Sequence, residues 1–187
     1  MADGGFWQLF RVREKDNLEF WVSHLIVLAS TVAGVYLAAS AGFDTAVAFE
    51  KMQSDKQGFY MRRALADELA DNLKEAEKWT GYFIEGDAWR FEGRVEDYPL
   101  QTYVWDAMKV NDATLQLPPK VLTGIRRFYR MTNLRVRDMV SRTGASRSAA
   151  EELRKDVKRM RADVVPLLAN DTKDFASRLT ARGINVN

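Results

Sequence analysis

Cysteine is absent from this chain, and histidine occurs once among its 187 residues. Without thiols the protein has no disulfide, no cysteine nucleophile and none of the common cysteine-ligated zinc sites. The single histidine, His24, lies inside an apolar run, so the polar part of the chain has no imidazole for a Ser-His-Asp triad or a metal site. Phosphate-binding, dinucleotide-binding, zinc-protease and calcium-loop motifs are also missing. We therefore expect a protein that is not an enzyme and carries no metal.

A long apolar run is the strongest feature that is present. Residues 20–43, FWVSHLIVLASTVAGVYLAASAGF, form 24 positions without a formal charge. A helix rises about 1.5 Å per residue, so the run is long enough to cross a hydrocarbon core of roughly 30 Å. We predict an all-α protein with a tail at 1–19, one transmembrane helix at 20–43 and a small helical-bundle domain at 44–187. Four apolar residues make the tail a candidate interfacial element: Phe6, Trp7, Leu9 and Phe10.

The run has a second interpretation, as a cleaved signal peptide, because Ala-Ser-Ala at 39–41 resembles a cleavage site. The polar leader of 19 residues is long for a signal peptide, which favours an uncleaved anchor. Basic residues near the run are almost balanced, three before it and four after it, so the positive-inside rule does not decide the orientation. We expect the N-terminus on the cytoplasmic side.

One face of the apolar run carries small residues at every fourth position: Ser30, Gly34, Ala38 and Gly42. Residues four apart share a helix face, and small side chains let another helix backbone approach closely within a bilayer. The pattern predicts lateral packing against an integral-membrane protein complex or a second copy of the chain.

His24 admits a sharper interpretation as an axial ligand to haem or to a chlorophyll-type pigment. It lies only one turn inside the run, and Phe20, one turn earlier, would crowd a macrocycle on that face. We expect an interfacial or hydrogen-bonded histidine and no cofactor.

After the run, the apolar spacing predicts a series of helices. An amphipathic helix over about 49–79 continues the apolar run or restarts after it, with a mild break at Gly58. Residues 81–99 are rich in glycine, aromatics and acids and are predicted to form a loop. A short helix containing Trp105 follows, and a Leu-Pro-Pro step opens a long helix over 117–142.

The C-terminal third is predicted to hold a basic amphipathic helix and a final shorter one. Ser146 or Ser148 is the expected N-cap of the basic helix, and Pro166 is expected to kink or end it. Asp171 is the expected cap of the last helix, and Gly183 its C-terminal glycine.

Charge is divided unevenly between the two parts of the chain. Residues 1–119 have 12 Lys and Arg against 19 Asp and Glu, whereas residues 120–187 have 16 against 7. The basic part either binds an anionic lipid or acidic protein surface or packs against this protein's own acidic middle. Nucleic acid is the less favoured partner, because base-stacking aromatics and a helix-turn-helix are missing. The predicted basic surface consists of Arg154, Lys155, Lys158, Arg159 and Arg161.

This order of features resembles a loose set of single-pass bacterial membrane proteins of uncharacterised activity. The resemblance covers about residues 19–140 and rests on an aromatic before the span, an L-x-x-E-L-x-x-N-L helix, a Trp, an L-P step and an aromatic followed by an Asn: Glu19, Trp21, Leu65, Glu68, Leu69, Asn72, Leu73, Trp105, Leu117, Pro118, Tyr129 and Asn133. The resemblance implies one membrane-spanning helix followed by a helical domain, located in a bacterial inner membrane. It supplies no catalytic residue.

Together these patterns favour a non-catalytic accessory or scaffold subunit of an inner-membrane complex. The alternative is a membrane-tethered sensor or signalling module with a helical ligand-binding domain. A membrane-anchored enzyme is the least favoured class, because the polar part of the chain has neither His nor Cys. A sensor is expected to self-associate and respond to a ligand, whereas an accessory subunit is expected to depend on its partner for stability.

Overall fold

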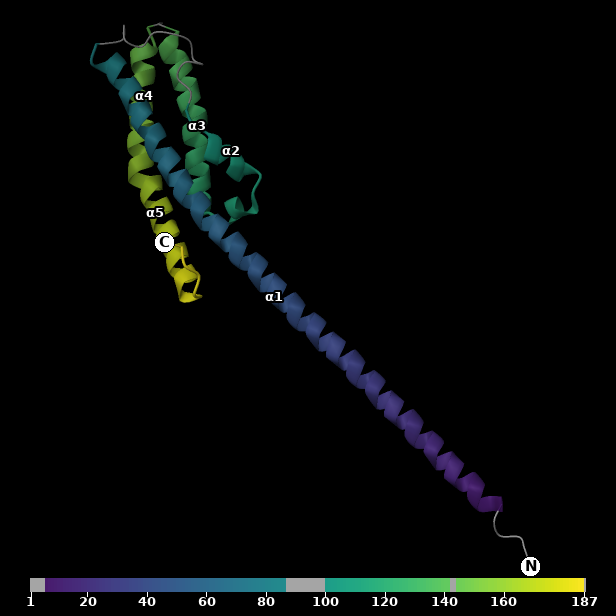
Figure 1. Ribbon diagram of the computed structural model, residues 1–187. Helices are drawn as coiled ribbons and strands as arrows, with labels where there is room; N and C mark the ends of the chain where they lie inside the picture. Colours follow the sequence, from purple (N-terminus) through teal and green to yellow (C-terminus); the bar gives the residue numbers. More distant parts are fainter. Residues whose placement is uncertain (1–5, 87–99, 142–143, 187) are drawn as a thin grey trace, which may run out of the picture. The chain divides into compact units, whose positions relative to one another are not determined.

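The computed structural model of the protein describes residues 6–86, 100–141 and 144–186, which are almost entirely helical and contain no strand. The helices in chain order are α1 (Phe6–Ile84), α2 (Tyr103–Lys109), the 3₁₀ helix η3 (Asp112–Gln116), α3 (Pro119–Val140), α4 (Ser146–Arg159), the π-helical turn η4 (Met160–Val164) and α5 (Val165–Ala181). Figure 1 labels the α-helices, α1 to α5. The chain divides into two units, Met1–Lys51 and Met52–Asn187. The all-α class is confirmed.

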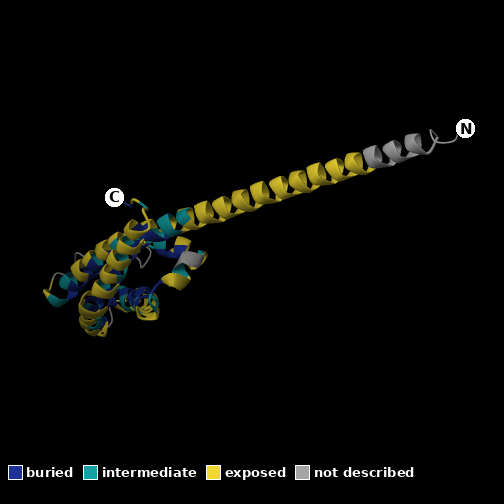
Figure 2. Ribbon diagram, turned by 90° about the horizontal axis from the view of Figure 1, so that it is seen from below, coloured by how far each residue is buried: buried dark blue, intermediate teal, exposed yellow. Residues whose placement is uncertain are grey.

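The apolar run lies within α1, and its side chains are exposed. Every residue from Leu18 to Lys51 is exposed, which Figure 2 shows as the yellow length of this helix. The helix continues through Gly58, so the predicted break there is wrong. No proline occurs before residue 99, so nothing interrupts the hydrogen-bond ladder of α1.

The predicted loop at 81–99 begins later than the sequence suggested. Residues 81–84 complete the last turn of α1, and Gly86 follows with a left-handed φ of 92°, a conformation that glycine adopts without steric cost. Residues 87–99 lie outside the described part of the chain.

The second unit is built from three long helical segments: the C-terminal part of α1, α3, and the continuous series α4, η4 and α5. Their apolar stripes meet in one core, to which α2 contributes Trp105 and Met108. The fully or almost fully buried members include Leu65, Leu69, Val121, Ile125, Phe128, Met139, Ala150 and Leu153. A second, smaller cluster joins α1 to α5 and the chain's end: Phe59, Phe175, Leu179 and Val186.

The predicted start of the long helix is confirmed, since Pro119 is the first residue of α3. At that position the missing N–H of proline has no intrahelical partner to lose. Gly183 is also confirmed as the glycine after α5, with a φ of 76°.

Two other predictions about helix ends are wrong, those for the serines and for Asp171, and of the two outcomes expected at Pro166 the end of the helix does not occur. Neither serine caps α4: Ala145 is the N-cap, and the Ser146 hydroxyl instead donates to the carbonyl of Asp138 at 3.3 Å. Pro166 does not end the helix, because the preceding turn widens into η4, where the Val165 N–H donates to Met160, five residues back. Asp171 lies inside α5 and forms an ion pair instead of a cap.

Candidate functional site

A buried polar cluster joins α1, α2 and α3. Glu68 and Asn72 lie four residues apart, so they share one face of α1. The Glu68 Oε2 atom accepts the Val104 N–H at 2.6 Å, and its Oε1 atom accepts the Trp105 N–H at 3.2 Å and the Tyr129 hydroxyl at 2.9 Å. The two N–H groups belong to the first turn of α2 and have no acceptor within that helix. Glu68 therefore acts as the cap of α2 from another helix.

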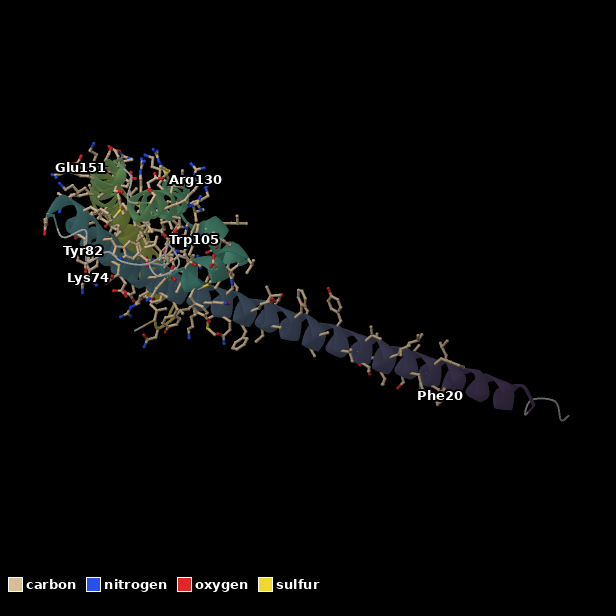
Figure 3. The ribbon with its side chains drawn as sticks, turned by 90° about the horizontal axis from the view of Figure 1, so that it is seen from above. Phe20, Lys74, Tyr82, Trp105, Arg130 and Glu151 are labelled. Carbon is tan, nitrogen blue, oxygen red and sulfur yellow. The ribbon has the colours of Figure 1, made fainter. Side chains whose placement is uncertain are left out.

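Asn72 holds the segment that leads into α2. Its Nδ2 group donates to the Gln101 carbonyl at 2.6 Å, and its Oδ1 atom accepts the Gln101 N–H at 2.9 Å. The same Nδ2 group donates to the Tyr129 oxygen at 3.1 Å. The Trp105 ring completes the cluster, with its centroid 5.8 Å from that of Tyr129. Figure 3 labels Trp105 within this part of the molecule.

The cluster's electrostatics keep Tyr129 protonated. Burial raises the pKa of the Tyr129 phenol, and the hydrogen bond to the Glu68 carboxylate raises it further. A neutral phenol that donates to a carboxylate is held in place and is unsuited to act as a base near neutral pH. Because Glu68, Asn72 and Tyr129 are engaged with one another and with backbone, we interpret the cluster as a structural device that positions α2.

Several residues behind the resemblance meet in this cluster. Glu68, Asn72, Trp105 and Tyr129 come together from three helices, whereas Asn133 is exposed on α3. Asn72 and Tyr129 are both buried in the unit.

The predicted basic surface on α4 and η4 is largely paired with acids. Arg154 lies 3.6 Å from Glu85 and Arg161 lies 2.7 Å from Glu77, so both reach acids of the chain's first half. The other two pairs are local, Lys155 with Glu152 at 2.7 Å and Arg159 with Asp156 at 3.3 Å. The Lys155 hydrogen bond and charge lower the pKa of Glu152. Of the five cations, only Lys158 has no ion pair with a described residue.

Cations without acidic partners gather instead on α3. Arg126, Arg127, Arg130 and Arg137 are exposed, and none forms an ion pair with another described residue. Figure 3 labels Arg130 at the outer surface of the unit. Sequence reasoning missed this surface, although α3 contains six Lys and Arg and a single acid, Asp138. We call these four residues the α3 arginine face.

A cavity of about 390 Å³ opens between α3, α4 and η4. Gly124 on α3 stands at this contact, and a Cβ there would lie 2.6 Å from the Val164 Cγ2 atom. Glycine at position 124 is thus required for α3 to approach η4 this closely. The cavity is lined by Pro119, Lys120, Thr123, Gly124, Arg127, Phe128, Met131, Asp156, Arg159, Met160, Asp163 and Val164.

In the first unit, His24 makes only a local contact among the described residues. Its Nδ1 atom lies 2.8 Å from the Phe20 carbonyl oxygen, and its ring centroid lies 4.0 Å from that of Phe20. The small-residue face is open: a Cβ added at Gly34 or Gly42 would meet nothing within 4 Å, Ala38 is exposed, and Ser30 donates to the Val27 carbonyl at 2.9 Å.

The comparisons with known proteins give no further guide, since no family model, curated protein or solved structure matches this chain. One helical stretch, Leu18–Ile84, includes a window long and apolar enough to cross a membrane, with a mean hydropathy of 1.8. Within the described ranges, no group of three or more His, Asp or Glu side chains is arranged to hold a metal ion.

Proposed function

We propose that this protein is a non-catalytic accessory subunit of a bacterial inner-membrane complex, anchored by the helix over residues 20–43. The observation that carries the proposal is the exposure of this apolar stretch along all its sides. None of the apolar window is buried, and Val27, Leu28 and Leu37 are each more than 60% exposed. A continuous exposed apolar surface of this size is typical of a segment that contacts lipid or another protein. The length of the apolar stretch matches the thickness of a hydrocarbon core.

The small-residue face would supply the lateral contact within the membrane. Ser30, Gly34, Ala38 and Gly42 leave room for a helix backbone, which is how helices associate where lipid is as apolar as leucine. Outside the membrane, the α3 arginine face would dock on an acidic protein surface, because its cations, unlike most of those on α4, form no ion pair with another described residue.

The buried polar cluster supports a non-catalytic role, since its groups hold α2 in place. We expect the protein to bind through surfaces, with its helical unit as a rigid support for the α3 arginine face.

The test is purification of the full-length protein in mild detergent from membranes of its source, followed by native electrophoresis and mass spectrometry. Stoichiometric recovery of a larger membrane complex is the expected result. Replacement of Gly34 by Leu should reduce that recovery while membrane insertion is unchanged. The matched control is Val32→Leu, which changes the opposite face of the same helix. Recovery of the protein alone, or an equal effect of both variants, would contradict the proposal.

The cavity beside Gly124 favours a second candidate function, a membrane-tethered sensor whose helical unit binds a ligand. Its volume of about 390 Å³ lies within the range of small-molecule sites, roughly 300–1,000 Å³. A sensor would self-associate in the membrane, so cross-linking that changes with added ligand would distinguish it from an accessory subunit.

A further inference from the structure

The cavity between α3, α4 and η4 has an apolar floor and a charged rim. Phe128, Met160 and Val164 line it and are buried, so its depth is hydrophobic. The charged residues that line it are exposed or half-buried: Lys120, Arg127, Arg159, Asp156 and Asp163. Such a division suits a molecule with an apolar part and a polar end.

The charges on the rim favour an anionic end. Asp156 and Arg159 form an ion pair at 3.3 Å, so their charges offset each other. The remaining charged residues that line the cavity are two cations, Lys120 and Arg127, and one anion, Asp163. Neither Lys120 nor Arg127 forms an ion pair with another described residue. A guanidinium offers parallel N–H groups that match a carboxylate or phosphate.

The backbone around the cavity is specialised as well. Residues of the π-helical turn η4, Met160, Asp163 and Val164, line it, and π-turns within helices occur frequently at functional sites. Gly124 lets α3 approach this turn, because any side chain there would meet Val164. The cavity therefore depends on two local departures from ordinary helix packing.

We propose that this cavity binds an amphipathic anion with a single alkyl chain, the chain lying on Phe128, Met160 and Val164 and the head meeting Arg127 and Lys120. The volume of about 390 Å³ is near the lower end of ligand sites, which favours one chain over the two of a phospholipid. The head is a carboxylate or a phosphate, which share the same recognition by guanidinium and ammonium groups. This inference rests on the cavity that favours the sensor, so its failure would remove the support for the sensor and leave the accessory role standing.

The test uses the full-length protein in zwitterionic lipid nanodiscs, with ¹³C-methyl methionine observed by NMR. Decanoate, decyl phosphate and decylammonium are the three probes. Met131 and Met160 line the cavity, whereas Met108 is a core residue that does not line it, so their methyl signals separate binding from a general effect. Saturable shifts of Met131 and Met160 with the anions, and none with decylammonium, are the expected result.

Two variants with the same charge change sharpen the experiment. Arg127→Glu should weaken anion binding by about tenfold or more, because it replaces a head-group contact with a repulsive charge. Arg130→Glu is the matched control: it lies on the same helix, does not line the cavity, and should leave binding unchanged.

A third variant, Met131→Trp, fills the cavity and should abolish the shifts of Met160 while the Met108 signal keeps its position. Tighter binding of decanoate identifies a carboxylate head, and tighter binding of decyl phosphate a phosphate head; both support the proposal. Shifts that never saturate, equal binding of decylammonium, or equal effects of the Arg127 and Arg130 variants would overturn it.

Discussion

Tyr129 shows how a single side chain connects buried hydrogen bonds to the pH dependence of folding. Its hydroxyl donates to the Glu68 carboxylate at 2.9 Å, and burial and that carboxylate raise the pKa of the phenol above its ordinary value of 10.0. Below pH 10 the phenol is neutral in both the folded and the unfolded chain. Above pH 10 the unfolded chain releases this proton while the folded protein keeps it, so stability falls as the pH rises.

We therefore predict a pH-dependent difference between the wild type and Tyr129→Phe. Near pH 8 the variant should be less stable by about 1–2 kcal/mol, because Glu68 loses a hydrogen-bond donor. Above pH 10 the difference should narrow by up to about 1.4 kcal/mol per pH unit, since only the wild type has this phenol to ionise. Urea unfolding of the detergent-solubilised protein, followed by tryptophan fluorescence, measures both effects.

Tyr103→Phe is the control, because Tyr103 is 86% exposed. It should leave the free energy of unfolding and its pH dependence unchanged. A constant difference between wild type and Tyr129→Phe from pH 8 to 11 would show that Tyr129 ionises alike in both states, contrary to its position in the cluster.

At the scale of helices, the contact between α3 and η4 depends on Gly124. A Cβ there would lie 2.6 Å from Val164 Cγ2 and 3.3 Å from Cγ1, and valine has little rotamer freedom in a helix. Gly124→Ala should cost about 1–3 kcal/mol of stability despite the better helix propensity of alanine. Gly81→Ala is the matched control, since its Cβ would come no closer than 3.8 Å to the Glu85 side chain, and it should stabilise by about 0.5–1 kcal/mol.

Chemical denaturation of Gly124→Ala, Gly81→Ala and Val164→Ala, and of Gly124→Ala combined with Val164→Ala, decides this prediction. The double variant should lose less free energy of unfolding than the two single variants lose in sum, because removing the Val164 methyl groups relieves the clash. Equal stabilisation by alanine at positions 81 and 124 would mean that α3 and η4 can separate without loss.

The same elements show what the sequence could predict. Local patterns succeeded: apolar spacing predicted the helices that are joined in α1, and the Leu-Pro-Pro step predicted the start of α3 at Pro119. At Pro166 the sequence could not decide the outcome: a proline removes a donor and its ring crowds the carbonyl four residues earlier, but whether the helix ends or widens into a π-turn depends on what packs around it. For Asp171, the favoured partner is Arg62, which is 109 residues away and outside any local pattern.

Only the local part of the polar cluster could be predicted from the sequence. The four-residue spacing of Glu68 and Asn72 places them on one face, but Val104 and Tyr129 join them only through tertiary packing. The α3 arginine face was missed because charge counting alone cannot tell paired cations from unpaired ones.

At the scale of the whole molecule, the second unit is closed at one end by ion pairs between α1 and the C-terminal region. Arg62 is 1% exposed, and its Nε group donates to Asp171 Oδ2 at 3.0 Å. Its Nη1 group donates to the Gly58 carbonyl at 2.9 Å, and its guanidinium lies 4.1 Å from the centre of the Phe175 ring. The second pair, Arg182 with Asp55 at 3.2 Å, has an exposed arginine. Burial should therefore make the two pairs differ in their effect on stability.

Removing one partner of a buried pair leaves an uncompensated charge, whereas an exposed pair contributes little. Arg62→Met should cost about 3 kcal/mol or more, and Arg182→Met, the matched control, less than about 1 kcal/mol. Arg62→Met combined with Asp171→Leu should recover part of the loss, because no charge then remains buried. Urea unfolding of the full-length protein, with hydrogen exchange of α5 amides, measures both the cost and its location. Equal effects of the two methionine variants, or loss of protection spread evenly over α3 and α5, would show that Arg62 does not hold this end closed.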